Sequence, residues 1–204
     1  MTTVAMGSSS QLHRGVMSLM HDFRHDVFVG RLGWSLPLEN GIERDKYDTP
    51  DAQYVVVSES EDRVTACARL LPTTQAYMLP ELFPQLLGSL PAPHAEDTWE
   101  LSRFATSVRG TREGRVMALA KPTLELFELV LDFARQRGVK RLLFVTSIAV
   151  ERLMLRAGFA SHRLAAPAIL GGCPCVALVL DVEPPVATAP SHGAADCDAR
   201  MACA

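Results

Sequence analysis

The sequence contains no apolar run of about 18 residues, the length that a helix needs to cross a bilayer. Its N-terminal segment, MTTVAMGSSSQLHRG, is polar and lacks the apolar stretch of a secretory signal. Basic residues are not in excess either, because the formal net charge is −3, and this gives little means of neutralising a phosphate backbone. These absences predict a cytoplasmic protein that binds neither membranes nor nucleic acids.

Cysteine is scarce, and the five that occur fit no common zinc-binding spacing. Cys173 and Cys175 form one C-x-C fragment, but no second pair of ligands accompanies it. We therefore expect reduced cysteines and no metal site. Apolar residues make up 48% of the chain and charged residues 21%, proportions typical of a globular protein with a substantial core.

Hydrophobic periodicity divides the chain into alternating helices and strands. It predicts helices over 11–29, 79–90, 119–137 and 150–158. It predicts strands over 53–58, 63–71, 98–106, 140–147 and 176–182. The early hairpin and the later alternation predict an α/β fold with three α-β-α layers around a mixed sheet. We expect one domain over 1–183 and, because large apolar residues almost vanish afterwards, a disordered tail over 184–204.

Several charged residues occupy positions that a plain core would not offer them. Arg69 interrupts the apolar strand ACARLLP, and Glu100 and Arg103 lie in WELSRF. If side chains alternate along this second strand, Glu100 and Ser102 share one face of the sheet and Arg103 opens onto the other. Unpaired burial of such charges would be costly, so they need partners.

A second group, of charged and aromatic residues, lies in or just before the irregular segment 30–51. This segment is too long and too charged for an inert connector. The group consists of Arg24, Phe28, Trp34, Asp45 and Asp48. Two interpretations remain open from the residues alone. The charged side chains line a substrate-binding cleft, or they form a structural network of ion pairs that ties the loop to the sheet.

Taken in order, the segments FRHDVFVGRLGW, ERDKYD, CARLLPTT, LF (82–83) and WELSRFA resemble the motifs of acyl-homoserine lactone synthases, the autoinducer synthase family. The later VTSIAVERLMLRAGF is also similar to that family's C-terminal half, so the resemblance covers most of the chain before the tail. The matching positions are Arg24, Phe28, Trp34, Asp45, Asp48, Arg69, Phe83, Glu100 and Arg103. Each motif alone is weak, whereas the ordered set is highly specific. The resemblance implies a mostly antiparallel sheet, as in GCN5-related N-acetyltransferases.

The resemblance also implies an acyltransferase that makes a quorum-sensing signal, an N-acyl-homoserine lactone. S-adenosylmethionine supplies the lactone part as a substrate, so no cofactor is expected, and acylated acyl carrier protein supplies the fatty chain. Methylthioadenosine and the free carrier are released.

Roles for individual residues follow from this chemistry. The substrate amine must lose a proton before it attacks the thioester, and we expect Glu100 to accept that proton. A salt bridge to an arginine is the alternative role for Glu100. Arg103 is the second residue expected to be catalytic, and either Arg103 or Arg24 suits the anionic part of the substrate. The residues expected either to bind S-adenosylmethionine or to fix the N-terminal loop are Arg24, Phe28, Trp34, Asp45, Asp48 and Arg69.

The acyl chain needs an apolar pocket. Candidates are Phe83, Ser102, Phe104, Phe144 and Thr146, although most of them suit an ordinary core equally well. Family members that use 3-oxo chains tend to carry threonine at the position that aligns with Phe144. The phenylalanine therefore favours an unsubstituted chain.

An acidic carrier protein needs a local basic patch on the enzyme. Candidates are Lys140, Arg141, Arg152 and Arg156, of which the last two lie four residues apart on one helix face. A solvated helix face is the alternative. Two other functions also remain: a coenzyme A-dependent GCN5-like N-acetyltransferase, and a non-catalytic ligand-sensing domain of the same fold. The chain lacks a convincing R/Q-x-x-G-x-G/A pyrophosphate loop, which favours the carrier-protein donor.

Overall fold

One sheet forms the centre of the computed structural model, which describes residues 2–36, 38–39, 41–107 and 121–183. The strands are β1 (Thr3–Ser8), β4 (Gln53–Ser60), β5 (Arg63–Pro72), β6 (Thr98–Thr106), β7 (Arg141–Ser147), β8 (Ser161–Arg163), β9 (Ala168–Leu170) and β10 (Cys173–Asp181). Their order is β1-β4-β5-β6-β7-β10-β8, with β9 beside β10. Within the described strands only β6 and β7 pair in parallel, which confirms a mixed, mostly antiparallel sheet.

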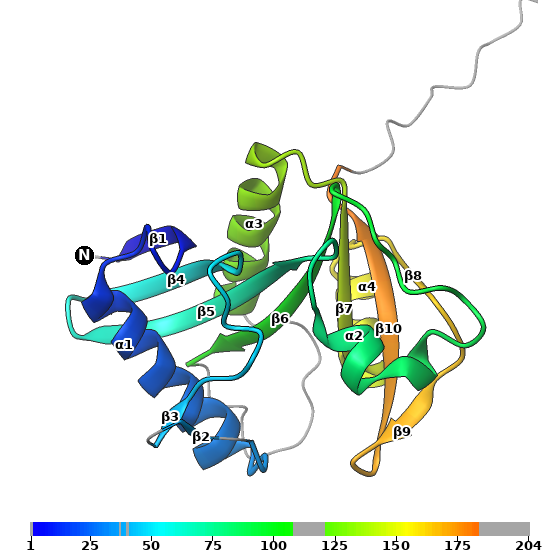
Figure 1. Cartoon of the computed structure of the whole chain (residues 1–204), viewed down its shortest axis with the longest axis horizontal. Coiled ribbons are helices and arrows are strands. Elements are labelled where there is room, and N and C mark those ends of the chain that lie inside the picture. The colour runs from blue at the N-terminus through cyan, green and yellow to red at the C-terminus, as the bar shows by residue number, and fades with distance from the viewer. Residues whose placement is uncertain (1, 37, 40, 108–120, 184–204) are drawn as a thin grey trace, which may run out of the picture.

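Helices cover both faces of this sheet (Figure 1). They are α1 (Arg14–Arg24), the π-helix η1 (His25–Arg31), α2 (Met78–Leu82), the 3-10 helix η2 (Pro84–Leu86), α3 (Lys121–Gln136) and α4 (Ile148–Arg156). On one face, Met20 of α1 and Leu79 of α2 enter one core. On the other, Phe133 of α3 and Met154 of α4 enter a second core. The expected three-layer α-β-α arrangement is confirmed.

The amphipathic pattern of α3 explains its place against the sheet. Leu126, Phe127 and Val130 are buried, whereas Glu125 is exposed, as a helix with one apolar stripe requires. Gly138, just beyond the helix, has φ of 73°, a left-handed conformation that favours glycine and ends the helix.

The N-terminal region differs from the sequence-based expectation in two ways. The helix predicted over 11–29 begins at Arg14, and its second half widens into η1. There the amide of Leu32 donates to the carbonyl of Val27, five residues back, at 3.0 Å. The segment Thr3–Ser8, for which no strand is predicted, forms β1 against β4. As a half-exposed edge strand it needs no apolar alternation. The long loop also contains a small separate hairpin of β2 (Leu38–Glu39) and β3 (Ile42–Glu43).

Strands β6 and β7 pair over a short length only. Their register joins Thr98–Trp99–Glu100 to Arg141–Leu142–Leu143. Beyond these pairs the two strands spread apart in Figure 1, near the middle of the sheet. This divergence leaves Glu100 at the point where the sheet divides.

No helix in the described ranges combines the length and the apolar character that crossing a membrane requires. The tail predicted over 184–204 lies outside the described residues. The domain predicted over 1–183 is described apart from residues 1, 37, 40 and 108–120.

Candidate active site

Three buried arginines from three parts of the chain meet on the α1 face of the sheet. Arg24 ends α1, Arg69 lies on β5 and Arg103 lies on β6. The side chains of Arg24 and Arg69 are 0% exposed, and that of Arg103 is 6% exposed. Guanidinium groups keep their charge at physiological pH, so burying three of them requires anions in contact with them.

The anions come from the loop between η1 and β4. Arg24 donates to Glu43 and, through its two terminal nitrogens, to Asp48 at 2.7 and 3.0 Å. Arg69 binds Asp45 in the same two-pronged way, at 2.6 and 3.1 Å. Paired hydrogen bonds of this kind fix the orientation of both groups as well as their distance. They therefore hold the loop firmly against α1 and β5.

Arg103 connects these ion pairs to one another, because it donates to Glu43 at 3.0 Å and to Asp45 at 2.6 Å. The resulting arginine–carboxylate network consists of Arg24, Arg69, Arg103, Glu43, Asp45 and Asp48. Three guanidinium groups and three carboxylates make it neutral as a whole. Glu43, which is fully buried, is not among the residues predicted from the sequence. The charge count does not reveal it, because the three arginines predicted for the site are already matched in number by Asp45, Asp48 and Glu100. Glu100 binds backbone amides instead, and Glu43 takes its place beside the arginines.

A β-bulge in β6 places Arg103 in the network. Next to the Arg69–Ser102 pair, β6 contains one more residue than β5. Arg103 itself has φ of 48°, the one positive value among the described non-glycine residues. The prediction that Arg103 faces away from Glu100 and Ser102 is therefore wrong. It assumed strict alternation, and the extra residue turns Arg103 to the side of Ser102, whose hydroxyl accepts from Arg69 at 3.0 Å.

The surrounding charges determine the protonation of the network. Burial alone would raise the pKa of Asp48, but the hydrogen bonds and charge of Arg24, together with the charge of Arg69, outweigh it and hold the pKa well below its usual range. The Tyr54 hydroxyl adds a further hydrogen bond to Asp48 at 3.0 Å. Asp48 is therefore ionised at any pH at which the protein works.

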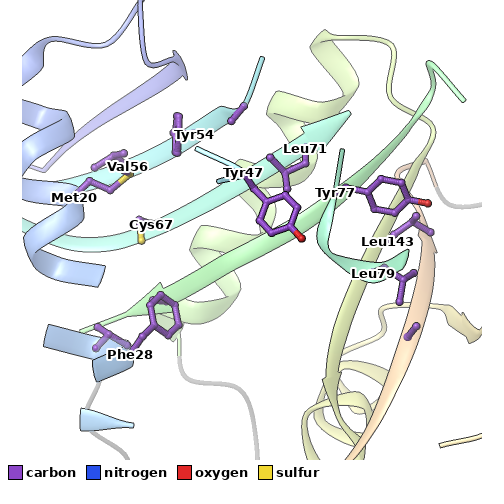
Figure 2. Close-up of a cluster of buried hydrophobic side chains, with 14 of the residues drawn as sticks. Met20, Phe28, Tyr47, Tyr54, Val56, Cys67, Leu71, Tyr77, Leu79 and Leu143 are labelled. Atoms are coloured by element: carbon purple, nitrogen blue, oxygen red, sulfur yellow. The ribbon is translucent and has the colours of Figure 1, made fainter. Parts of the chain in front are cut away.

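A cavity of about 740 Å³ opens beside the network. Asp45, Asp48 and Arg103 form part of its wall, together with Trp34, which is 47% exposed. Trp34 stacks on Phe28 at a centroid distance of 5.0 Å, and the Arg103 guanidinium lies 5.5 Å from the Phe28 centroid. Figure 2 shows Phe28 beside the end of β6. Apolar side chains that complete the wall include Leu36, Met78, Leu82 and Phe83. Such a lining suits a ligand that carries both signs of charge and an apolar or aromatic part.

Glu100 lies behind the α2 side of this cavity and is 2% exposed. Its carboxylate accepts hydrogen bonds from the backbone N–H groups of Met78 at 2.8 Å and Leu79 at 2.7 Å. Burial raises the pKa of Glu100 to about 7, against the opposing effect of these two hydrogen bonds and of Arg69 and Arg103. Within the described residues Glu100 forms no salt bridge with an arginine. Its structural role is instead to hold the N-terminus of α2.

The residues predicted for the acyl pocket lie on both faces of the sheet. Phe83 and Ser102 are on the α1 face. Phe83 lines the cavity, and Ser102 binds Arg69. Phe104 and Phe144 are on the α3 face, where both contact Phe127 edge-on, at centroid distances of 5.9 and 6.3 Å. Thr146 faces the same side, since it pairs with Val176 of the α3-side core. One pocket can include both groups only by passing between β6 and β7, where their pairing stops.

The residues predicted for carrier docking form two pairs. Lys140 directly precedes β7, and Arg141 is its first residue. Both form ion pairs with Asp97, at 3.7 and 3.2 Å. Arg152 and Arg156 are exposed on α4. Because Asp97 partly balances the first pair, the α4 pair is the better candidate for binding an acidic surface.

A family model described as autoinducer synthase matches residues 8–187, a range that contains the whole network and the cavity wall. The chain belongs to the autoinducer synthase family. The acyl-homoserine-lactone synthase of Acinetobacter nosocomialis is 36% identical, over 88% of this chain and 99% of the relative. That of Ralstonia solanacearum is 40% identical, over 85% of each chain. This chain is accordingly a transferase of the acyl-homoserine-lactone synthase type.

Solved structures agree with this assignment. The synthase LasI matches with a TM-score of 0.78 at 31% identity, over 90% of this chain and 91% of its own. BjaI, described as a CoA-dependent acyl-homoserine lactone synthase and solved with SAM and isopentyl-CoA, also gives 0.78, at 27% identity over 90% and 84%. A putative N-acetyltransferase from Lactobacillus plantarum shares the fold, with a TM-score of 0.59 at 17% identity over 89% and 99%. The expected N-acetyltransferase-like fold is confirmed.

Proposed function

We propose that this synthase transfers the acyl chain of an acylated acyl carrier protein to the amine of S-adenosylmethionine and then closes the homoserine lactone. The observation that carries the proposal is the position of Glu100, a buried carboxyl group beside a cavity lined by charges of both signs. Burial raises the pKa of this group to about 7. A group with this pKa exchanges protons readily at neutral pH. We also assign the enzyme to the cytoplasm, where both proposed substrates are made.

The cavity divides the predicted binding residues into two sets. Arg24 and Arg69 are fully buried and do not line the cavity, so we assign them to holding the loop. Trp34, Asp45 and Arg103 face the cavity, so we assign them to S-adenosylmethionine. Asp48 also lines the cavity, but its carboxylate is bound by Arg24 and Tyr54, so we assign it to holding the loop. A sulfonium or ammonium group is attracted to the face of the Trp34 ring and to Asp45, and the substrate carboxylate suits Arg103.

The first step forms the amide. The substrate ammonium loses one proton to Glu100, and its nitrogen attacks the thioester carbonyl carbon. The carbon–sulfur bond then breaks, and the departing carrier thiolate takes the second proton that the nitrogen gives up as the amide forms. The amides of Met78 and Leu79 occupy two acceptor positions of the Glu100 carboxylate. A carboxylate offers about four such positions, so capacity for the proton remains. Because Glu100 lies behind Met78, one bridging water carries the proton.

The second step closes the ring. A carboxylate oxygen of the acylated substrate attacks the carbon beside the sulfonium, the carbon–sulfur bond breaks, and methylthioadenosine leaves with the electron pair. This step needs no further proton transfer, so the protein contributes mainly by holding the carboxylate in position. Arg103 is suited to this task because the bulge fixes its backbone and Glu43 and Asp45 fix its guanidinium.

The acyl donor is tested by offering the same acyl chain on acyl carrier protein and on coenzyme A. Methylthioadenosine release gives the rate, and mass spectrometry of the lactone confirms the product. We expect the higher kcat/KM with the carrier protein, in keeping with the lack of a convincing pyrophosphate loop in the sequence. Likeness to the CoA-dependent BjaI favours the second candidate, coenzyme A, and equal or faster turnover with acyl-CoA would establish it. No methylthioadenosine release with either donor would refute the proposal.

A further inference from the structure

One carboxylate on α2 joins the two walls of the cavity. Glu81 pairs with the Lys46 ammonium and accepts a hydrogen bond from the Tyr47 hydroxyl at 3.0 Å. Lys46 and Tyr47 line the cavity from the loop, whereas Met78 and Leu82, on either side of Glu81 in the sequence, line it from α2. Figure 2 shows the Tyr47 hydroxyl directed toward the segment that carries Leu79. Glu81 therefore connects the loop wall to the helix wall.

We propose that Glu81 is a positioning residue for amine acylation, which keeps α2 against the loop and thereby holds in place the α2 amides that bind Glu100. The inference rests on the proposed role of Glu100 as the proton acceptor. It concerns Glu81, Lys46 and Tyr47, which we call the α2 tether.

The α2 helix needs outside support because it is short. It contains five residues, whereas an isolated helix of fewer than about 12 is marginal in water. Its N-cap residue, Tyr77, makes no side-chain cap hydrogen bond, and Leu79 is the one buried residue of the helix. Two carboxylates replace the missing support. Glu100 binds the first amides of α2, and Glu81 binds the loop from the helix itself.

Tyr47 is a rigid partner for this contact. Its side chain is almost fully buried, and its backbone N–H donates to Asp45 at 2.9 Å. The Arg69 guanidinium lies 5.8 Å from its ring centroid. Burial raises the pKa of Tyr47 well above its usual value, and the charges of Glu81 and Glu100 add to the rise. The hydroxyl therefore remains a hydrogen-bond donor at every working pH, and it links α2 to the arginine–carboxylate network.

Loss of the tether has a predictable effect on Glu100. The charged and titratable groups that face Glu100 are Arg69, Arg103, Tyr47 and Tyr77, and the hydrogen bonds to it come from the amides of Met78 and Leu79. Those amides favour the carboxylate form. If α2 loosens, this stabilisation weakens and the pKa of Glu100 moves upward. The acidic limb of the pH–rate profile then moves to higher pH, which a purely structural role of Glu81 would not cause.

The experiment uses the full-length variants Glu81→Gln and Tyr47→Phe, with Glu59→Gln as the control. Glu59 forms an exposed ion pair with Arg63 in the β4–β5 hairpin, and neither residue lines the cavity. Hydrogen exchange of the α2 amides reports the tether directly, and kcat at saturating substrates over a range of pH reports positioning. For Glu81→Gln we expect about five- to tenfold faster α2 exchange and a similar fall in kcat, as for loss of a half-exposed charged contact. Tyr47→Phe should give a smaller change in the same direction.

Each outcome decides the question. Unchanged α2 exchange in Glu81→Gln would overturn the tether, and faster exchange with unchanged kcat and pH profile would overturn its positioning role. Failure of the proposed base is a separate result: full activity of Glu100→Gln would remove the role of Glu100, whatever the exchange data show. The control should match the wild type in both measurements, and a control that behaves like Glu81→Gln would also refute the inference.

Discussion

Replacing Glu100 by glutamine tests the site most directly, because the change removes one ionisable proton site and almost no volume. A positioned general base contributes between about 100-fold and 10,000-fold to rate, so we expect kcat to fall within that range. Binding of S-adenosylmethionine should change little, since Glu100 is 2% exposed and does not line the cavity. A fall in kcat with a nearly constant KM is the expected pattern.

The same variant has a calculable effect on stability. The pKa of Glu100 is about 7 in the folded protein against an ordinary value of 4.5, so ionising it in the fold costs about 3 kcal/mol. Because the folded pKa is raised, the wild type has its full stability below the unfolded pKa and loses part of it as pH rises through 7. Glutamine offers one oxygen to two amides, and the unmatched amide costs about 1–3 kcal/mol at every pH.

Urea unfolding of both proteins at pH 5 and pH 8 separates these effects. The stability of the wild type relative to Glu100→Gln should decrease by about 2 kcal/mol between the two pH values. Methylthioadenosine release at pH 8, with acyl carrier protein as donor, measures the loss of turnover. A folded variant that turns over at the wild-type rate would refute the proton-acceptor role. A stability difference that does not depend on pH would refute the raised pKa.

Three further predictions concern the network, the cavity and the carrier surface. Asp48→Asn should lower the free energy of unfolding, measured by urea denaturation, by about 3–5 kcal/mol, because it leaves the buried guanidinium groups of Arg24 and Arg69 short of a negative charge. Because the pKa of Asp48 is depressed in the fold, the stability of the wild type should fall as pH drops below 4. Trp34→Ala should raise KM for S-adenosylmethionine about tenfold while the fold is kept, and an unchanged KM would exclude the ring from the binding site. Charge reversal at Arg152 and Arg156 together should raise KM for acylated carrier roughly tenfold at low salt, and less at high salt. An unchanged value would place docking elsewhere.

The main elements follow from the sequence because their patterns are local. The stripe of Leu124, Phe127, Leu131 and Ala134 predicts α3. The apolar segments around Arg69 and Phe144 predict β5 and β7. The need of the buried arginines for anionic partners was also evident, since unpaired burial is costly. Which anions they bind, and in what geometry, depends on how the long loop packs, and no local pattern encodes that packing.

The features of the site that the sequence does not predict depend on tertiary packing. Glu43 lies in a Gly- and charge-rich segment typical of an exposed turn, and α1 and the sheet bury it. The orientation of Arg103 depends on one extra residue opposite β5, which the sequence of β6 does not mark with a glycine. The tether between Glu81 and Tyr47 joins residues 34 apart that show no pattern in common.

The neutrality of the arginine–carboxylate network has a consequence for proton balance. S-adenosylmethionine carries two positive groups and one negative group, so a cation enters a site whose fixed charges already cancel. Glu100, which binds the amide of the cavity residue Met78, is a group able to adjust, because its pKa is about 7. An added positive charge favours its carboxylate form. Substrate entry and deprotonation of the acceptor are therefore thermodynamically linked: the bound cation itself prepares the base that later takes the proton from its amine.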